Sequence, residues 1–222
     1  MADPGGDAGR GFYRELAATR PELLGAIWRF NAAAPEPGAL APGVAGLLRA
    51  CPRGRAALAR MADPGRRFWA FEEESRRLAL LDPPTLEALA LHFGAAVNAR
   101  ALAGVVLRAE RQALEAALGP DILGYALGRG AFHLGEVRAH FLARHGERPL
   151  AERVRLHGRE ALDACAGRWP RPLRELAARR FPGLVDANAQ APGDRAVERL
   201  TWFGLKKLLT KEVAPSWAPC FF

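Results

Sequence analysis

Residues 98–118 read NARALAGVVLRAERQALEAAL, and this stretch predicts the fold class of the chain. At the 100° rotation per residue of an α-helix, apolar side chains fall on one narrow arc and charged or amide side chains fall on the opposite arc. The apolar arc holds Leu102, Val106, Ala109 and Ala113, and the polar arc holds Arg100, Arg108, Arg111, Gln112 and Glu115. This spacing predicts one amphipathic helix over 98–118 that packs its apolar arc into a core.

The composition extends this prediction to the whole chain. Residues that favour strands are scarce (2 Ile, 9 Val, 4 Thr and 2 Tyr), whereas the helix-favouring Ala, Leu, Arg and Glu dominate. Half of the 222 residues are hydrophobic and a quarter are charged, which is ordinary for a globular protein. We therefore expect an all-α fold, a single compact multi-helix globular domain over 1–222.

Prolines, glycines and capping residues divide the chain into expected helices and loops. An aspartate before proline, as at Asp63–Pro64 and in DPP at 82–84, is typical of a helix start. The expected helices span 11–19, 21–32, 44–60, 64–81, 84–93, 98–118, 121–128, 131–145, 149–166, 171–181 and 194–212. The Pro/Gly-rich stretches 31–43 and 185–193 are expected loops, and 213–222 is an expected apolar C-terminal tail.

The formal charge of +8 is concentrated in residues 129–180, where 12 Arg stand against 6 Asp or Glu. A basic helical nucleic-acid-binding module is one interpretation of this excess. The other is that Arg replaces Lys almost everywhere (29 Arg against 3 Lys), which raises the pI without creating a site. We expect no nucleic-acid partner and keep the nucleic-acid-binding module as the alternative function.

Cysteine usage and hydropathy indicate the compartment. The three cysteines, Cys51, Cys165 and Cys220, form no CxxC pair, which fits a reducing cytoplasm. The N-terminal MADPGGDAGRG lacks the basic and apolar regions of a signal peptide. The most apolar stretch, 86–107, is interrupted by charged and polar residues, so we expect no direct membrane insertion.

The best enzymatic candidate is HLGEVRAH, residues 133–140. On one helix, His133, Glu136 and His140 would share a face and could contribute to a metal site, which would make the chain a metal-dependent helical enzyme. The other interpretation is a polar helix face, on which Arg138 and Arg144 would repel a cation. No Walker A motif or serine-hydrolase elbow occurs either, so we expect no metal, no cofactor and no catalytic residue.

The last seventeen residues, KKLLTKEVAPSWAPCFF, contain every lysine of the chain and end on aromatic residues. In the helix expected over 194–212, Val197, Leu200, Gly204 and Leu208 make an inner face and Trp202 lies on the other side. An apolar terminus must pack on its own domain or on a partner, and interfaces favour Trp and Arg. The hypothesised partner-binding residues are Trp202, Lys206, Lys207, Lys211, Trp217, Phe221 and Phe222. The alternative is that the tail covers Trp202 within the same molecule.

Three stretches, in this order along the chain, carry a resemblance to a known family. They are WRFNAAAPEP at 28–37, LGPDILGYAL at 118–127 and LKKLLTKEVAPSWAPCFF at 205–222. The first resembles an early Phe-x-x-Pro segment, the second a Leu-rich segment that ends in a Leu-Ile-Gly turn, and the third a Lys-rich helix followed by a Pro step, a Cys and a terminal Phe. On these stretches the sequence resembles the SctK (YscK-like) family of bacterial type III secretion systems.

The resemblance implies a non-enzymatic adaptor of the cytoplasmic sorting platform, and thus a role in virulence-associated protein transport. SctK-like proteins link the cytoplasmic domain of the inner-membrane ring protein SctD to the pod protein SctQ, with SctL and the ATPase SctN beyond it. The implied location is cytoplasmic and peripheral to the inner membrane through partner proteins, and the chain alone is expected to be a monomer. The resemblance does not locate the interfaces, and we take the basic region 129–180 as a candidate surface for an acidic partner because of its charge.

Overall fold

The computed structural model describes residues 7–32, 51 and 68–221. Over these ranges the ordered elements are all helices and no strand occurs, which confirms the all-α class. Its contacts divide the chain into two compact units, residues 1–74 (unit 1) and 75–222 (unit 2). Buried hydrophobic side chains lie in both units.

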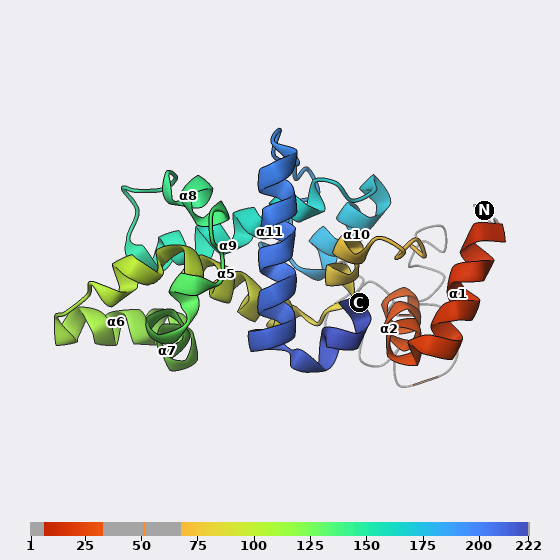
Figure 1. The fold of residues 1–222 in the computed structure, drawn as a ribbon, viewed down its shortest axis with the longest axis horizontal. Coiled ribbons are helices and arrows are strands. Elements are labelled where there is room, and N and C mark those ends of the chain that lie inside the picture. Colours follow the sequence, from red (N-terminus) through yellow and green to blue (C-terminus); the bar gives the residue numbers. More distant parts are fainter. Residues whose placement is uncertain (1–6, 33–50, 52–67, 222) are drawn as a thin grey trace. The chain divides into compact units, whose positions relative to one another are not determined.

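Unit 1 contains the helices α1 (Asp7–Thr19) and α2 (Pro21–Ala32), which Figure 1 draws in red and orange. Residues 68–73 follow without forming a helix, and Phe68 is bonded to the end of α2. The Asn31 side-chain amide donates to the Phe68 carbonyl at 2.8 Å and accepts from the Phe68 N–H at 2.8 Å. The Asn31 side chain thus pairs with the backbone as a neighbouring strand would, and fixes the Phe68 backbone at the end of α2.

Aromatic rings complete the core of unit 1. Phe71 is fully buried and packs edge-on against Phe30 and Phe68, with ring centroids 5.5 and 5.2 Å away. Beside them, the Tyr13 hydroxyl donates to the Trp69 carbonyl. Burial and the nearby Glu72 carboxylate raise the pKa of Tyr13, so this hydroxyl keeps its proton as a donor.

Unit 2 is a larger helical assembly, and its helices α5 to α11 are drawn in Figure 1 from yellow-green to blue. Its elements are η1 (Glu74–Leu80), α5 (Pro83–Ala103), α6 (Arg108–Leu118), α7 (Pro120–Gly128), η2 (Gly130–Phe132), α8 (Val137–Leu142), α9 (Leu150–Ala166), α10 (Arg171–Arg180), α11 (Arg195–Leu208), the π-helical turn η3 (Leu209–Val213) and η4 (Pro215–Phe221).

Helix α5 is the centre of unit 2. It starts where Asp82 caps the Thr85 N–H at 2.8 Å and Pro83 occupies the first turn, as the DPP motif predicts. Its side chains are buried on several sides, because α7 and α9 pack along it and α11 crosses over both α5 and α9 (Figure 1). A helix surrounded in this way is mostly apolar, which explains its Ala- and Leu-rich sequence.

Helices α5 and α9 approach each other so closely that only glycine fits at two positions. A Cβ built on Gly94 of α5 would lie 1.8 Å from the Val154 carbonyl oxygen, and one built on Gly158 of α9 would lie 2.0 Å from the Ala90 carbonyl oxygen. The two backbones therefore touch directly, and each glycine accommodates the other helix. This contact holds the centre of unit 2 together.

The structure contradicts the predicted division of this region. The separate helices expected over 84–93 and 98–118 are wrong, because α5 continues through Gly94 to Ala103 and the chain then breaks before α6 begins at Arg108. Gly104 ends α5, and Val106, expected in the core, is 91% exposed in the break. The helical spacing of apolar residues in the sequence therefore extends beyond Gly104, where the helix itself ends.

The helix expected over 131–145 is also broken. Residues 130–132 form a 3-10 turn, Gly135 adopts the left-handed conformation at φ 51°, and α8 begins only at Val137. A left-handed residue cannot continue a right-handed helix, and glycine adopts this conformation without a steric penalty. The predicted helix over 194–212 is confirmed as α11 with a wider last turn, and 185–193 is a loop as expected.

Other expectations fall partly or wholly outside the described residues. This applies to the helix over 44–60, to most of the loop over 31–43 and to Phe222. Within the helix expected over 64–81, residues 68–73 form no helix and the 3-10 helix η1 follows. Among the helices that are described, none is long and apolar enough to cross a membrane.

Candidate interaction site

The C-terminal tail folds back into unit 2. Phe221 is fully buried, and its ring lies 6.0 Å from the Trp202 ring of α11, measured between centroids. The Cys220 carbonyl accepts a hydrogen bond of 2.8 Å from the guanidinium of Arg77, which is itself buried in η1. The tail therefore bonds to the first helix of unit 2 and packs on its last α-helix, as the internal-packing alternative predicts.

The other hypothesised partner-binding residues divide by exposure. Lys207 and Lys211 are exposed, whereas Trp202, Lys206 and Trp217 are half-buried. In the structure, Phe221 is thus buried against the half-buried Trp202, and Lys207 and Lys211 lie on the surface.

A polar cluster fixes the turn that precedes the tail. The Glu212 side chain is only 7% exposed. Its carboxylate forms an ion pair with the Arg129 guanidinium at 2.8 Å, and its other oxygen lies 3.7 Å from His133 Nε2. His133 Nδ1 lies 2.8 Å from the Tyr125 hydroxyl, and the Tyr125 ring lies 4.7 Å from the His92 ring. The cluster connects η3 to α7 and to η2, so it holds the end of α11 against the centre of unit 2.

The protonation states of this cluster follow from its geometry. The Tyr125 hydroxyl is a donor, because burial first and the Glu212 charge second raise the pKa of Tyr125. His133 Nδ1 then accepts, and its Nε2–H points toward the Glu212 carboxylate. Burial, with Lys207 next, lowers the pKa of His133 and keeps this imidazole neutral at pH 7. The arrangement positions a buried carboxylate and binds the C-terminal segment.

The three residues considered for a metal do not share one helical face. His133 belongs to the Tyr125–Glu212 cluster, Glu136 precedes α8, and His140 accepts from Arg144 at 3.1 Å. The break at Gly135 separates the first of them from α8. Within the part of the chain that the structure describes, no group of three His, Cys, Asp or Glu side chains could hold a metal ion.

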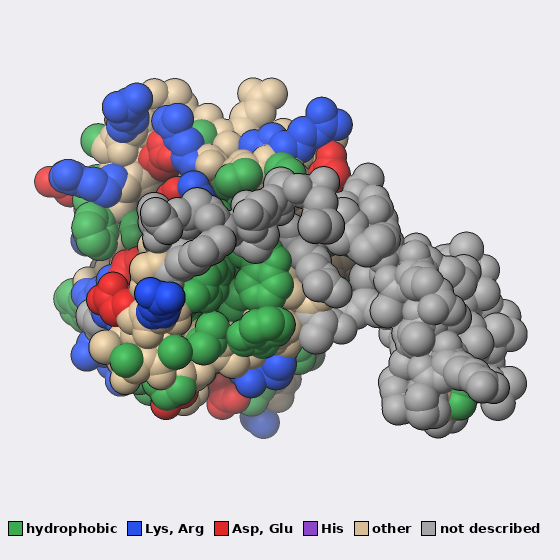
Figure 2. Space-filling model, turned by 90° about the vertical axis from the view of Figure 1, so that its right-hand side faces the viewer, with side chains coloured by type: hydrophobic (Ala, Val, Ile, Leu, Met, Phe, Trp, Pro, Cys, Tyr) green, Lys and Arg blue, Asp and Glu red, His purple; other side chains and the backbone are tan. Residues whose placement is uncertain are grey.

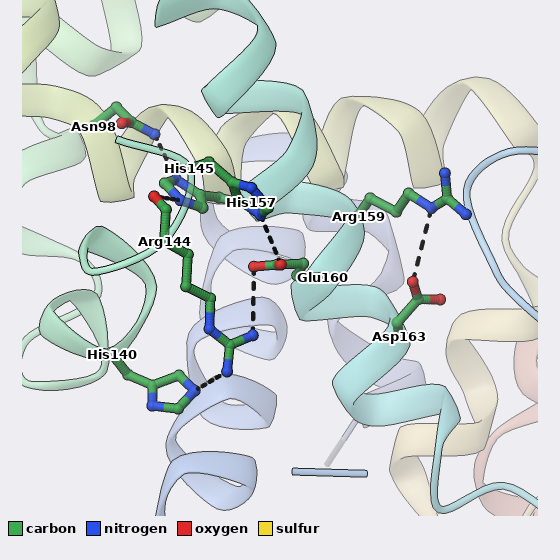
Figure 3. Close-up of polar contacts among 8 residues, drawn as sticks. All are labelled: Asn98, His140, Arg144, His145, His157, Arg159, Glu160 and Asp163. Carbon is green, nitrogen blue, oxygen red and sulfur yellow. Dashed lines mark hydrogen bonds and ion pairs between the residues drawn. The ribbon is translucent and has the colours of Figure 1, made fainter. Parts of the chain in front are cut away.

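A second polar network lies at the contact between α5 and α9 (Figure 3). His157 of α9 is buried; its Nε2 lies 3.2 Å from the Arg144 carbonyl oxygen and its Nδ1 lies 2.9 Å from Asn98 Nδ2 of α5. The carbonyl can only accept, so His157 carries its proton on Nε2 and Nδ1 accepts from the Asn98 amide. Nearby, His145 bonds the Glu160 carboxylate at 2.7 Å. Neutral His157 is therefore the form that this structure accommodates.

We expect acidification to destabilise the protein through His157. Burial lowers the pKa of His157 in the folded state, so below the ordinary value of about 6.5 the unfolded chain binds a proton that the folded chain does not. Stability is thus lost as the pH falls below about 6.5, by up to about 1.4 kcal/mol per pH unit for one group. Urea unfolding between pH 7.5 and 5.5 measures this dependence.

The matched variant for this prediction is His157→Gln, since glutamine keeps one donor and one acceptor but does not titrate. We expect its unfolding free energy to vary less with pH than that of the wild type. Some dependence remains in the variant, because burial also lowers the pKa of His92 and of His133. Identical pH dependence in the two proteins would contradict the role assigned to His157.

The basic region 129–180 uses its arginines largely for internal contacts. Within it, Arg144, Arg148, Arg159 and Arg171 pair with acidic residues of the same region, while Arg129 and Arg168 pair with Glu212 and Glu198. Four more, Arg138, Arg155, Arg174 and Arg179, donate to backbone carbonyls. Most arginines of this region therefore have a hydrogen-bond or ion-pair partner within the molecule.

The outer face of α11 is a surface feature that sequence reasoning missed. Leu200, expected on the inner face, is exposed, and Phe203 is 53% exposed. The buried side of the helix carries Gly204 and Leu208, as predicted, together with Thr201 and Leu205, whereas Val197 is half-buried. The spacing of Ala196, Leu200, Phe203 and Lys207, alternately four and three residues, is the sequence signal that could have identified this face.

Comparison of the chain with protein-family models, with curated protein sequences and with solved structures gives no significant match.

Proposed function

We propose that this protein is a non-enzymatic adaptor of a type III secretion sorting platform. In this role it joins an SctD-like ring protein at the cytoplasmic face of the inner membrane to an SctQ-like pod protein. The resemblance of residues 28–37, 118–127 and 205–222 to SctK-like proteins suggests the system. The structure contributes physical arguments for a binding role.

The observation that carries the proposal is that both compact units expose large aromatic side chains. In unit 1, Trp28 is 58% exposed while its ring packs edge-on against Trp69 at 5.0 Å. In unit 2, Phe203 is exposed on α11. Aromatic side chains are frequent anchors at the centres of protein interfaces, and an adaptor requires two interfaces. Figure 2 shows one face of the molecule on which hydrophobic side chains gather beside Lys and Arg side chains.

The nucleic-acid-binding alternative has less support. Non-specific affinity for nucleic acid comes mainly from arginine and lysine side chains that neutralise phosphates. In the basic region six arginines already pair with carboxylates and four more with carbonyls. A carboxylate beside each of these six arginines offsets part of the positive charge that a phosphate backbone would meet.

A bridging assay tests the proposed function. The SctD-like cytoplasmic domain from the same secretion system is immobilised, and the SctQ-like protein is added with and without this chain. We expect retention of the SctQ-like protein only when the chain is present, because each partner binds a different surface. Retention of the SctQ-like protein without the chain, or no retention with it, would contradict the adaptor role. Displacement of both proteins from the chain by a 20-base-pair DNA duplex would favour the nucleic-acid-binding alternative.

A further inference from the structure

We propose that the outer face of α11 is the docking surface for an acidic amphipathic helix of a partner protein. The docking strip consists of Ala196, Leu200, Phe203 and Lys207, all exposed along one side of the helix. This inference deepens the proposed function and rests on it, because it assigns the partner contact of unit 2.

The geometry of the strip suits a helix. Its four residues follow each other at intervals of four, three and four, which is the spacing of the contact positions in a two-helix coiled coil. Helix α11 has 14 residues, so it is about 21 Å long and could face three turns or more of a partner helix. Figure 1 shows α11 lying across α5 and α9, with its outer side uncovered in that view.

The charges beside the strip determine the chemistry of the partner. Arg195 and Arg199 are exposed beside the strip on α11, Lys207 is the last residue of the strip, and Lys211 follows in the next turn. The one acidic residue of α11, Glu198, is bound by Arg168 through two hydrogen bonds of 2.6 and 3.0 Å. The apolar part of the strip, Ala196, Leu200 and Phe203, is therefore bordered by positive charge, and a helix with leucines on one side and carboxylates at its edges complements it.

Charge also argues against a second copy of this chain as the occupant. An antiparallel or parallel pair of α11 helices would place Arg199 and Lys207 of each copy beside the same cations of the other, and like charges in contact are unfavourable. An acidic partner removes this repulsion. The same reasoning predicts that binding weakens as salt is added.

A synthetic peptide tests the inference without the secretion proteins. The probe is a fluorescein-labelled 21-residue peptide with leucine at the a and d positions of three heptads and glutamate at e and g. The control peptide carries lysine at e and g. Fluorescence anisotropy with the full chain should give at least tenfold tighter binding of the acidic peptide, and Phe203→Asp should weaken that binding at least tenfold.

Val106→Asp is the matched control variant, because it adds the same charge at an exposed residue between α5 and α6. We expect it to bind the acidic peptide like the wild type. Equal affinity for the two peptides, no binding of the acidic one, or binding unchanged by Phe203→Asp would overturn the inference. A dimer in light scattering that Phe203→Asp abolishes would also overturn it in favour of a second copy. Failure of the bridging assay alone would instead reject the secretion adaptor.

Discussion

Replacing Gly158 with alanine should lower the free energy of unfolding by about 3 kcal/mol or more, because overpacked cores lose 1–3 kcal/mol and this clash involves backbone. The added Cβ would lie 2.0 Å from the Ala90 carbonyl oxygen, a distance that the backbone of α5 cannot accommodate without moving. Gly94→Ala, with its Cβ 1.8 Å from the Val154 carbonyl oxygen, should be at least as damaging. Separating α5 from α9 would also strain the Asn98–His157 bond.

Gly124→Ala in α7 is the control for both variants. Its new Cβ would meet no atom within 4 Å, so the substitution should be neutral or stabilise the protein by up to about 1 kcal/mol through the unfolded chain. Urea unfolding followed by far-UV circular dichroism measures all three variants. Equal unfolding free energies for the Gly158→Ala and Gly124→Ala variants would show that the contact between α5 and α9 is looser than the structure has it.

These glycines also show where sequence reasoning about the fold reaches its limit. Glycine is unfavourable inside a helix, so the sequence around Gly94 reads as the end of one helix and the start of another. In the structure Gly94 lies inside α5, at the point where the backbone of α9 approaches. The stabilisation that glycine provides here comes from the close contact between α5 and α9, which are distant in sequence. The local sequence pattern does not distinguish a glycine that ends a helix from one that lets a second helix approach.

The opposite error occurs at the end of the same helix. The apolar spacing of Leu102 and Val106 continues the helical period, yet α5 stops at Gly104 and Val106 is exposed. Composition correctly predicts the all-α class, because propensities summed over many residues are informative. Helix ends depend on single residues and on their surroundings, and a period alone does not determine them.

The sequence predicts the helix and the apolar tail of the C-terminal segment, but not the residues that hold them. Its lysines and aromatic residues single it out in the sequence, and the structure confirms a helix followed by an apolar tail. Its anchors come from distant parts of the chain: Arg77, which bonds Cys220, is 143 residues away, and Glu212 meets Arg129 and His133. Such pairs arise from the fold, so no local motif could have indicated them.

The tail should prove essential to stability, and Phe221→Ala should lower the free energy of unfolding by about 3–5 kcal/mol, the usual cost of removing a fully buried phenylalanine side chain. The substitution leaves a cavity beside Trp202, which the tail otherwise covers. Deletion of 215–222 should cost more, because it also removes the Cys220 carbonyl that Arg77 binds. Phe132→Ala, at an exposed position of η2, should change stability by less than about 0.5 kcal/mol and serves as the control. A deletion variant with wild-type urea unfolding would mean that the tail is not packed into unit 2, and its aromatic residues would then be available to a partner.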